Sequence, residues 1–410
     1  MRILVVGAGG VGAAFAAIAQ RREAFERVVL ADIAPERVRS VVAALGEPSR
    51  FGAERVDASS QADLQALIGR VRPDAVLNAC DPRFNEPIFG AAFEARVNYL
   101  DMAMTLSRPH PQRPYELPGT MLGEHQLAQH DAWEQAGLLA LVGIGVEPGM
   151  SDVFAAYAAQ ELFSNIDEIG VRDGGDLVID GYDFAPTFSI WTTIEECLNP
   201  PLIWERGRGH YTTVPFSEPE IFEFPEGIGP LECVNVEHEE VVLIPRWVQC
   251  ERVTFKYALG DEFIEVLRTL HKLGLDSTEP VTVRGVQVSP RDVLAAALPD
   301  PATLGERMSG RTCAGTWVRG TGMDGAPRST YLYHVVDNEQ TMREYGAQAV
   351  VWQTAINPIA ALELLDRGTW KGAGVLGPEA FPPRPFLELL AELGSPTGRQ
   401  ELEAPAGGRP

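Results

Sequence analysis

A glycine-rich turn within the first twelve residues is the feature that most constrains the fold of this chain. The sequence begins with the apolar run "ILVV", continues with "GAGGVG", and passes into the alanine-rich helical pattern "AAFAAIA". Gly7, Gly9 and Gly12 therefore have the spacing in which the first glycine allows a tight turn, the second lets the backbone approach a pyrophosphate, and the third lets helix and strand pack closely. The pattern predicts a strand, a turn and a helix whose N-terminus faces phosphates.

The second predicted strand ends in an acid that bears on the choice of cofactor. The segment "RVVLAD" ends at Asp32, twenty residues after Gly12. An acid at this strand end accepts hydrogen bonds from a ribose and repels a 2′-phosphate, so the pattern favours NAD over NADP. Arg37 lies five residues further on and is suited to a 2′-phosphate, so NADP stays open.

Alternation of strand and helix patterns continues through the first third of the chain. Further strands are predicted in "ERVDASS", "DAVLNACDP", "RVNYLDMA" and "LLALVGIGVEPG", with helical patterns between them. This order predicts an α/β domain with a doubly wound parallel sheet, in which ligands lie beyond the carboxyl ends of the strands. The residues predicted to bind the cofactor are Gly7, Gly9, Gly10, Val11, Gly12, Asp32, Ile33, Asp57, Ala58, Asn78, Ala79, Cys80 and Val146.

After about residue 148 the pattern changes, and strands follow one another without alternating helices. Strands are predicted in "IDEIGVRDGG", "TFSIWTTIEECL", "VVLIPRW" and "VTFKYALG", a helix in "DEFIEVLRTLHKLG", and a hairpin around "MDGAP". Strands in succession, packed on helices, predict an open sheet in a second domain of the α+β class. A helical apolar pattern returns after residue 345, and the composition of residues 395–410 predicts a disordered tail.

Composition limits the classes of function. The chain has 410 residues, which indicates two domains, and a formal net charge of -23, which argues against nucleic-acid and anionic-membrane partners. No run approaches the roughly twenty apolar residues of a membrane helix. The five cysteines are an odd number and widely spaced, which predicts reduced thiols and a cytoplasmic location. No ligand spacing indicates a metal site.

One short segment concentrates titratable groups. In "ECVNVEHEEVVLIPRW", His238 stands between Glu237 and Glu239, and an apolar run separates them from Arg246. Imidazole titrates near neutral pH, and arginine binds a carboxylate through two parallel hydrogen bonds. We interpret the segment as the edge of a substrate cavity, with His238 as proton shuttle, Glu239 as its partner or an amine contact, and Arg246 as a carboxylate clamp. The alternative is a solvated strand end with a surface ion pair.

A second catalytic candidate is Asp101, at the carboxyl end of the fifth predicted strand, where a nicotinamide is expected. An acid there binds a substrate ammonium group or acts as a base, and the alternative is a cap or turn residue. Trp191 is a candidate wall of the substrate pocket, with core packing as the alternative. The residues predicted to contact substrate are Tyr99, Met102, Arg172, Trp191 and Arg246.

Several motifs, in this order, resemble those of the saccharopine dehydrogenase-like family, which includes saccharopine reductases, carboxynorspermidine dehydrogenases and lysine 6-dehydrogenases. They are "GAGGVG", "ADI", "NYLDMA", "GIGVEPGMSD", "FEFPEGIGPLE", "HEE", "FKYALGDEF", "GTGMDG" and "GVLGPEAF". The resemblance spans residues 1 to about 390. It implies an NAD(P)-binding Rossmann domain at 1–148, completed by about 345–390 folding back. It also implies a domain at 149–344 with an open mixed sheet for substrate binding and dimer formation.

The resemblance further implies hydride transfer at a carbon–nitrogen bond of an amino acid or polyamine derivative, through an imine. The expected partners are a small amine or amino-acid substrate and a second copy of the chain in a homodimer. Two alternatives stay open. One is a transferase similar to homospermidine synthase, which uses NAD internally, and the other is a dinucleotide-binding protein without catalysis.

Overall fold

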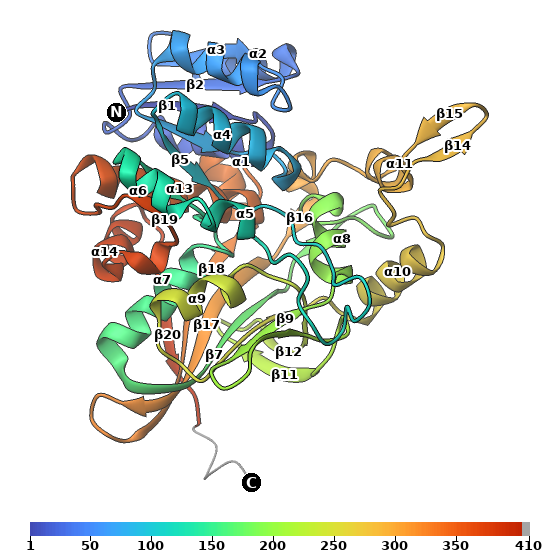
Figure 1. The fold of residues 1–410 in the computed structure, drawn as a ribbon, viewed down its shortest axis with the longest axis vertical. Helices are drawn as coiled ribbons and strands as arrows, with labels where there is room; N and C mark the ends of the chain where they lie inside the picture. The colour runs from blue at the N-terminus through green and yellow to red at the C-terminus, as the bar shows by residue number, and fades with distance from the viewer. Residues whose placement is uncertain (404–410) are drawn as a thin grey trace.

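The computed structural model describes residues 1–403. Within them, a parallel sheet of seven strands forms the core of the first domain (Figure 1). Its order is β19-β6-β5-β4-β1-β2-β3, so the strand order reverses beside β1, as in a doubly wound fold. The strands are β1 (Arg2–Val6), β2 (Arg27–Asp32), β3 (Phe51–Arg55), β4 (Ala75–Asn78), β5 (Asn98–Asp101), β6 (Leu139–Leu141) and β19 (Gly374–Leu376). The predicted Rossmann architecture is therefore confirmed.

Helices cover both faces of this sheet, which explains why its central strands are continuous apolar runs. They are α1 (Gly10–Ala19), α2 (Pro35–Leu45), α3 (Gln61–Val71), α4 (Asn85–Glu94), α5 (Glu124–Leu127), α6 (His130–Ala136) and α13 (Ala349–Asp366). The last of these packs on α1, although more than 300 residues separate them in the chain. The third strand was expected to reach Asp57, but it ends at Arg55, and Asp57 and Ala58 lie in the following turn.

Within the described residues, a mixed sheet of nine strands forms the core of the second domain, which lies below the first domain in Figure 1. Its main path is β10-β9-β13-β7-β17-β18-β20; off this path, β12 pairs with β13, and β11 pairs with β12. Only the pairing of β13 with β7 is parallel along this path. The strands are β7 (Phe163–Gly175), β9 (Leu202–Glu205), β10 (Gly209–Thr212), β11 (Glu220–Phe224), β12 (Gly229–Asn235), β13 (Arg252–Tyr257), β17 (Arg311–Gly322), β18 (Pro327–Asp337) and β20 (Gly398–Glu401).

Two segments predicted as strands are helices that lie near this sheet. They are α8 (Ile190–Leu198) and α9 (Glu240–Trp247). A short apolar run does not distinguish a buried strand from a buried helical segment, and Val241 to Ile244 are all buried. The acids before this run favour a helix start, because negative charge is stabilised at a helix N-terminus. The remaining helices are α7 (Met150–Tyr157), α10 (Asp261–Lys272), α11 (Pro290–Ala297), α12 (Asn338–Tyr345) and α14 (Pro383–Glu392).

The predicted disordered tail at 395–410 is wrong where the structure describes it. Residues 398–401 form β20, which adds to the edge of β18 through antiparallel pairing. The polar composition of the segment misled the prediction, because an edge strand needs backbone hydrogen bonds and few apolar side chains. Residues 404–410 of that prediction lie outside the described residues.

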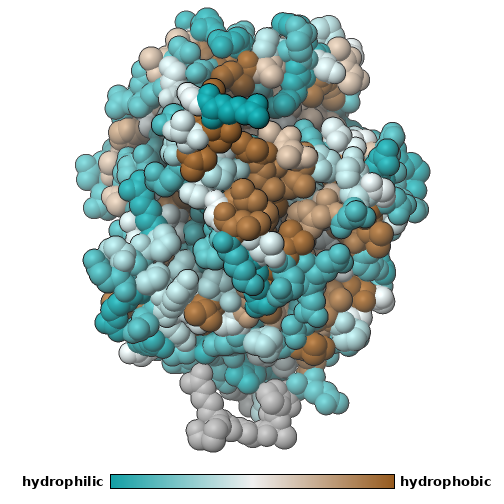
Figure 2. Space-filling view, turned by 90° about the vertical axis from the view of Figure 1, so that its right-hand side faces the viewer, coloured by the Kyte–Doolittle hydropathy of each residue, from teal (hydrophilic) through white to brown (hydrophobic). Residues whose placement is uncertain are grey.

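A small hairpin, β14 (Val281–Val283) and β15 (Val286–Val288), projects from the molecule at the right of Figure 1. Val281, Val283 and Val286 are between 47% and 61% exposed. Figure 2 faces this side and shows apolar residues gathered in the middle of a mostly hydrophilic surface. Among residues 1–403, no helix has the length and apolar character that crossing a membrane requires.

Candidate active site between the two sheets

The glycine turn forms a cradle with room for a phosphate group. Gly7 has a φ of +106°, and a Cβ there would lie 2.4 Å from the carbonyl oxygen of Ala79. A Cβ on Gly12 would lie 2.0 Å from the carbonyl oxygen of Gly7, whereas one on Gly9 would meet nothing within 4 Å. Gly7 and Gly12 are therefore packed against backbone, whereas the space beside Gly9 is free for a phosphate group. Because α1 starts at Gly10 with no side-chain cap, its N–H groups are free for a pyrophosphate.

The adenosine end of the predicted cofactor site lies at the ends of β2 and β3. Asp32 accepts hydrogen bonds from the backbone N–H groups of Ala8 and Ala34, both at 2.9 Å, so it also holds the glycine turn. The Arg37 guanidinium lies 3.7 Å from the same carboxylate and is largely exposed. Ile33 is 57% exposed, an apolar side chain beside the turn that carries Asp57. These residues fit an adenosine and supply a carboxylate for its ribose and a guanidinium for a 2′-phosphate.

The nicotinamide end is expected at the ends of β4, β5 and β6, where Asn78, Tyr99 and Asp101 form a buried network. The Tyr99 hydroxyl donates to Asp101 Oδ2 at 3.0 Å and accepts from Asn78 Nδ2 at 3.1 Å. Asp101 also accepts from Gln126 Nε2 at 2.6 Å and from the Gly143 backbone N–H at 2.7 Å. Burial raises the pKa of Asp101 to about 7. Through these hydrogen bonds, Asp101 connects the ends of β4, β5 and β6.

Three further predicted residues lie around this network. Asn78 Oδ1 accepts from the Cys80 N–H at 3.0 Å, and the Cys80 thiol donates to the Val6 carbonyl at 3.3 Å. Burial raises the pKa of that thiol to about 12, so it is no nucleophile at neutral pH. Val146 is buried, and Met102 is half-buried with its carbonyl 3.0 Å from the position a Cβ on Gly145 would take. These residues shape the strand ends by packing.

Alternation along the second sheet decides which side chains face the first domain. Tyr257 and Asp173 are register partners on the parallel strands β13 and β7, so their side chains share one face. The next pair along, Lys256 and Arg172, points to the opposite face, where both form ion pairs with Glu220. The structure therefore does not bring Arg172 to the predicted substrate site. Its neighbour Asp173 is there instead, because successive strand residues face opposite ways.

His238 lies at the centre of this face and is only 1% exposed. Its ring stacks on Phe255, with centroids 3.8 Å apart and planes 7° apart. Nδ1 lies 2.6 Å from Glu240 Oε2 and 3.3 Å from Glu239 Oε2, and Nε2 lies 3.0 Å from the Tyr257 hydroxyl. Burial alone would lower the pKa of His238, but Glu240 and the neighbouring acids outweigh it and raise the pKa to about 10. His238 is therefore held as an imidazolium.

Acids from six different segments surround this imidazolium, and we name them the acidic cluster. Its members are Glu147, Asp152, Asp173, Glu196, Glu239, Glu240 and Glu379. Burial raises the pKa of Glu196 to about 8, of Glu379 to about 7 and of Asp173 to about 6. The pKa of Glu147 lies well above its ordinary value, first through burial and then through Asp173. So many acids in one buried place are costly unless a cation joins them.

Within the described residues, several oxygens of the acidic cluster are buried and have no hydrogen-bond partner. They are both carboxylate oxygens of Glu147, both of Glu379, Oδ1 of Asp152 and Oε2 of Glu196. Glu147 follows β6, at the carboxyl end of the first sheet, and it interacts with Asp173 on the second sheet. The unpaired oxygens thus lie where the expected nicotinamide edge and the second domain meet. Glu147, Asp173 and Glu196 are half-buried and form the outer part of the cluster, and the other members are fully buried.

Arg246 and Trp191 lie outside the acidic cluster. Arg246 is exposed near the C-terminal end of α9, six residues and about 9 Å along the helix axis from Glu240. The strand that would have placed it beside His238 does not form. Trp191 is buried between two guanidinium groups, with its ring centroid 4.0 Å from Arg83 Cζ and 4.6 Å from Arg291 Cζ.

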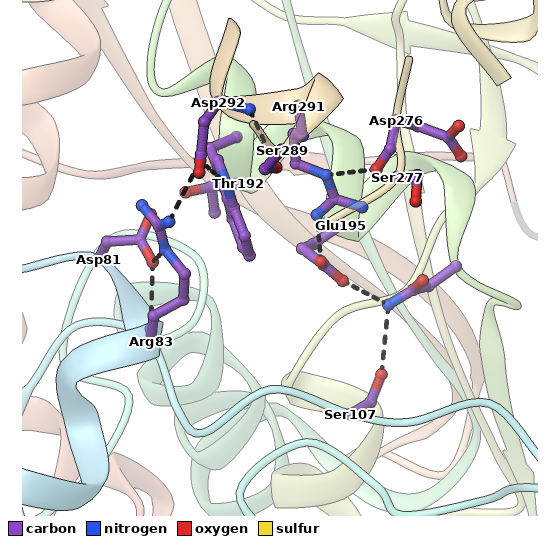
Figure 3. A network of polar contacts seen from close by, with 12 residues as sticks. Asp81, Arg83, Ser107, Thr192, Glu195, Asp276, Ser277, Ser289, Arg291 and Asp292 are labelled. Atoms are coloured by element: carbon purple, nitrogen blue, oxygen red, sulfur yellow. Dashed lines mark hydrogen bonds and ion pairs between the residues drawn. The ribbon is translucent and has the colours of Figure 1, made fainter. Parts of the chain in front are cut away.

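The surroundings of Trp191 join the first domain to the second (Figure 3). Arg83, just after β4, pairs with Asp81 at 2.9 Å and with Asp292 of α11 at 3.5 Å. Arg291 of the same helix pairs with Glu195 of α8. Because α8 also carries Glu196 into the acidic cluster, this network holds α8 between the cofactor edge and the cluster.

Among the members of the acidic cluster, only Glu239 was predicted from the sequence as a site residue. Glu147 and Asp152 stand in "GIGVEPGMSD" and Glu240 in "HEE", both quoted as family motifs, so the acids in these motifs were the available signal. Asp173, Glu196 and Glu379 stand in unrelated segments, and only folding brings them together. Glu239 belongs to the cluster and His238 contacts it; that both residues act in the active site stays a prediction.

Comparisons with known proteins agree with this arrangement. Residues 3–141 match the family model of the saccharopine dehydrogenase NADP binding domain, and residues 145–395 match that of the saccharopine dehydrogenase C-terminal domain. The chain is 33% identical to a carboxynorspermidine synthase of Vibrio alginolyticus over 98% of both chains. It is 30% identical to a carboxyaminopropylagmatine dehydrogenase of Synechocystis over 96% of both.

A solved structure supports the same conclusion for the fold. Saccharopine dehydrogenase (L-Glu forming) from Saccharomyces cerevisiae superposes with a TM-score of 0.69 at 14% sequence identity, over 98% of this chain and 100% of that one. The glycine cradle and the match to an NADP binding domain identify NAD(P) as the cofactor. With both family models matched in order along the chain, this protein belongs to the saccharopine dehydrogenase family.

Proposed function

We propose that this NAD(P)-dependent dehydrogenase acts on the carbon–nitrogen bond of a carboxylated polyamine. The observation that carries the proposal is that buried carboxyl oxygens of Glu147 and Glu196, beside the expected nicotinamide edge, have no N–H partner, and Glu147 meets only the carboxyl group of Asp173. A buried carboxylate without a partner is unfavourable, and an ammonium group supplies three donors and the opposite charge. A substrate with several amino groups therefore satisfies the site.

The same charges disfavour saccharopine, another substrate in this family. Saccharopine carries more carboxylates than amino groups, and its carboxylates would meet the acidic cluster. The nearby cations Arg172 and Lys256 face away from the site and are already paired with Glu220. Placing like charges together costs several kcal/mol, so the site discriminates against an acidic substrate. The names of the relatives, a carboxynorspermidine synthase and a carboxyaminopropylagmatine dehydrogenase, are those of enzymes for carboxylated amines and support the proposal.

The chemistry follows from the positions of these groups. The glycine turn would hold NAD(P)⁺, which would supply the hydride acceptor for the carbon next to the substrate nitrogen. Glu147, Asp173 and Glu196 hold the substrate ammonium groups and orient that carbon, and the two domains exclude bulk water from the site. After oxidation, water adds to the iminium carbon, and the carbon–nitrogen bond breaks to release an amine and a carbonyl compound. The reverse direction joins the two and reduces the imine.

We also propose a cytoplasmic location. All five cysteines are free thiols, and four of them are buried. Unpaired thiols persist in a reducing compartment, which supports this proposal.

The first prediction concerns substrate choice. Purified protein with NAD⁺ or NADP⁺ should oxidise carboxynorspermidine with a kcat/KM about 100-fold or more above that for saccharopine, because the carboxylates of saccharopine would meet like charges at a cost of several kcal/mol. The absorbance of the reduced nicotinamide measures the rate. Glu196→Gln should raise KM for the polyamine about tenfold, since a charged hydrogen bond is lost.

Glu223→Gln is the matched control, because Glu223 is exposed on β11 and outside the cluster. A preference for saccharopine would contradict the proposal. Amine exchange detected by mass, with no net reduction of the cofactor, would identify a transferase instead.

The second prediction concerns the choice between NAD and NADP. We propose that Asp32 favours binding of NAD and that Arg37 binds the 2′-phosphate of NADP. Arg37→Ala should therefore raise the Kd of NADP about tenfold and leave the Kd of NAD nearly unchanged, as measured by nicotinamide fluorescence. Arg39→Ala, on the same helix and paired with Glu36, is the control. Equal changes for both cofactors would contradict the assignment.

The third prediction concerns stability and pH in the substrate-free protein. Asp173, Glu379 and Glu196 have folded pKa values of about 6, about 7 and about 8, so the folded protein keeps protons that the unfolded chain has released above about pH 4. His238, with a pKa of about 10, acts in the same direction above about pH 6.5. The free energy of unfolding should therefore fall by a few kcal/mol between about pH 5 and about pH 9.

Melting temperatures across this pH range measure the effect. Glu196→Gln removes one of the proton-binding differences and should make the fall shallower. A melting temperature that rises from pH 5 to pH 9 would contradict the assignment of raised pKa values.

The fourth prediction concerns assembly. We propose a homodimer, and the exposed valines of the β14–β15 hairpin support it, because a hairpin of this size is marginally stable in water alone. Sedimentation should give twice the chain mass of 44.6 kDa. The double variant Val283→Asp and Val286→Asp should sediment as a monomer, with Thr282→Asp on the same hairpin as the control. A monomer for the unaltered protein at all concentrations would contradict the proposal.

A further inference from the structure

The Tyr257 hydroxyl stands between His238 and the outer part of the acidic cluster. His238 is 1% exposed and packed against Phe255, so no substrate atom reaches its ring without moving the core. Tyr257 is half-buried at the end of β13, and its hydroxyl lies 3.0 Å from His238 Nε2. Tyr257 therefore offers a path for a proton between His238 Nε2 and a substrate.

The protonation state of His238 sets the direction of the Tyr257 hydroxyl. Glu240 Oε2 accepts from Nδ1 at 2.6 Å, and its other oxygen accepts from the Ser151 hydroxyl at 2.7 Å. An imidazolium donates from both nitrogens, so Nε2–H donates to the Tyr257 oxygen and leaves the phenol proton free. A neutral ring with its proton on Nδ1 would accept the phenol proton instead. The charged form thus points the phenol O–H away from the ring.

The groups that face this hydroxyl come from four elements besides its own strand. Near Tyr257 itself they are Glu196 of α8, Asp173 of β7 and Glu147 after β6. Near His238 they are Glu240 and Glu239 at the start of α9. Burial and then Glu196, Asp173 and Glu147 raise the pKa of Tyr257 well above its ordinary value. The phenol is therefore neutral in the resting protein and available as a donor. The same three acids are those that we propose to hold the substrate ammonium groups.

We propose that Tyr257 is the catalytic acid and base at the substrate nitrogen, with His238 and Glu240 as positioning residues behind it. This proposal rests on the proposed function, because it needs an amine substrate held by the outer acids. It transfers the role of proton shuttle, which the sequence suggested for His238, to a residue that reaches the substrate.

The proton step balances within the site. The substrate ammonium first releases one proton to solvent, the hydride leaves, and water adds to the iminium with release of a second proton to solvent. The neutral carbinolamine then carries a hydroxyl and an amine on one carbon. Tyr257 donates its proton to the nitrogen, the carbon–nitrogen bond breaks, and its electron pair leaves with the nitrogen. The phenolate accepts a hydrogen bond from His238 until it takes the proton of the carbinolamine hydroxyl as the carbonyl forms. Tyr257 is thereby restored, and the hydride on the cofactor accounts for the two electrons.

Tyr257→Phe tests the proposal directly. It should lower kcat about 100-fold or more, as loss of a general acid does, with KM for the polyamine and the affinity for NAD(P) little changed. Tyr211→Phe is the matched control, because Tyr211 is also half-buried and donates to Glu205 at 3.0 Å away from the cluster. An undiminished kcat in Tyr257→Phe would overturn the role of Tyr257 while leaving the proposed function intact.

Glu240→Gln provides a second test, which measures the pH dependence of kcat. A purely structural role of Glu240 would leave this pH dependence unchanged. In the unaltered protein kcat should stay constant with rising pH until His238 loses its proton near pH 10, and in Glu240→Gln this fall should move toward neutral pH. Nitrogen NMR of labelled histidine in the ligand-free protein should show both His238 nitrogens protonated at pH 8. A neutral ring would overturn the proposal. Inactivity toward every amine, with a charged ring, would overturn the proposed function and this proposal with it.

Discussion

The contact between His238 and Glu240 is the interaction on which the candidate site depends. It places an imidazolium and a carboxylate 2.6 Å apart where both are fully buried. Removing one partner of a buried ion pair leaves the other uncompensated and costs about 3 to 5 kcal/mol. The pair is held by a stacked Phe255 on one side and by Ser151 on the other. Its geometry therefore links the second sheet to the helix that follows the first domain.

The two domains contribute different parts of one site. The first provides the glycine turn and the strand ends, where free N–H groups face a dinucleotide. The second provides one face of a mixed sheet, from which Asp173 and Tyr257 point toward the first domain. Glu147 meets Asp173 at the junction, so neither domain contains the acidic cluster by itself. A substrate that enters between them meets carboxylates from both, beside the edge where the hydride is transferred.

The parts of the fold that sequence reasoning predicted are those with local signals. The glycine spacing, the acid at Asp32 and the alternation of strands with helices are properties of short segments, and the structure confirms the Rossmann sheet they predict. The errors occurred where local patterns are ambiguous. The buried runs in α8 and α9 have no period that separates strand from helix, and the polar strand β20 depends on pairing with β18.

The sequence by itself determined the class of the protein: a dinucleotide turn, a second α+β domain and a titratable segment around His238. These follow from residue type and spacing along the chain. Only the tertiary structure decided which charged groups meet. Strand alternation selected Asp173 and turned Arg172 away, and the helix at Glu240 carried Arg246 to the surface. The physical reason is that the electrostatics of a buried site depend on distance and burial, and both arise when segments remote in sequence pack together.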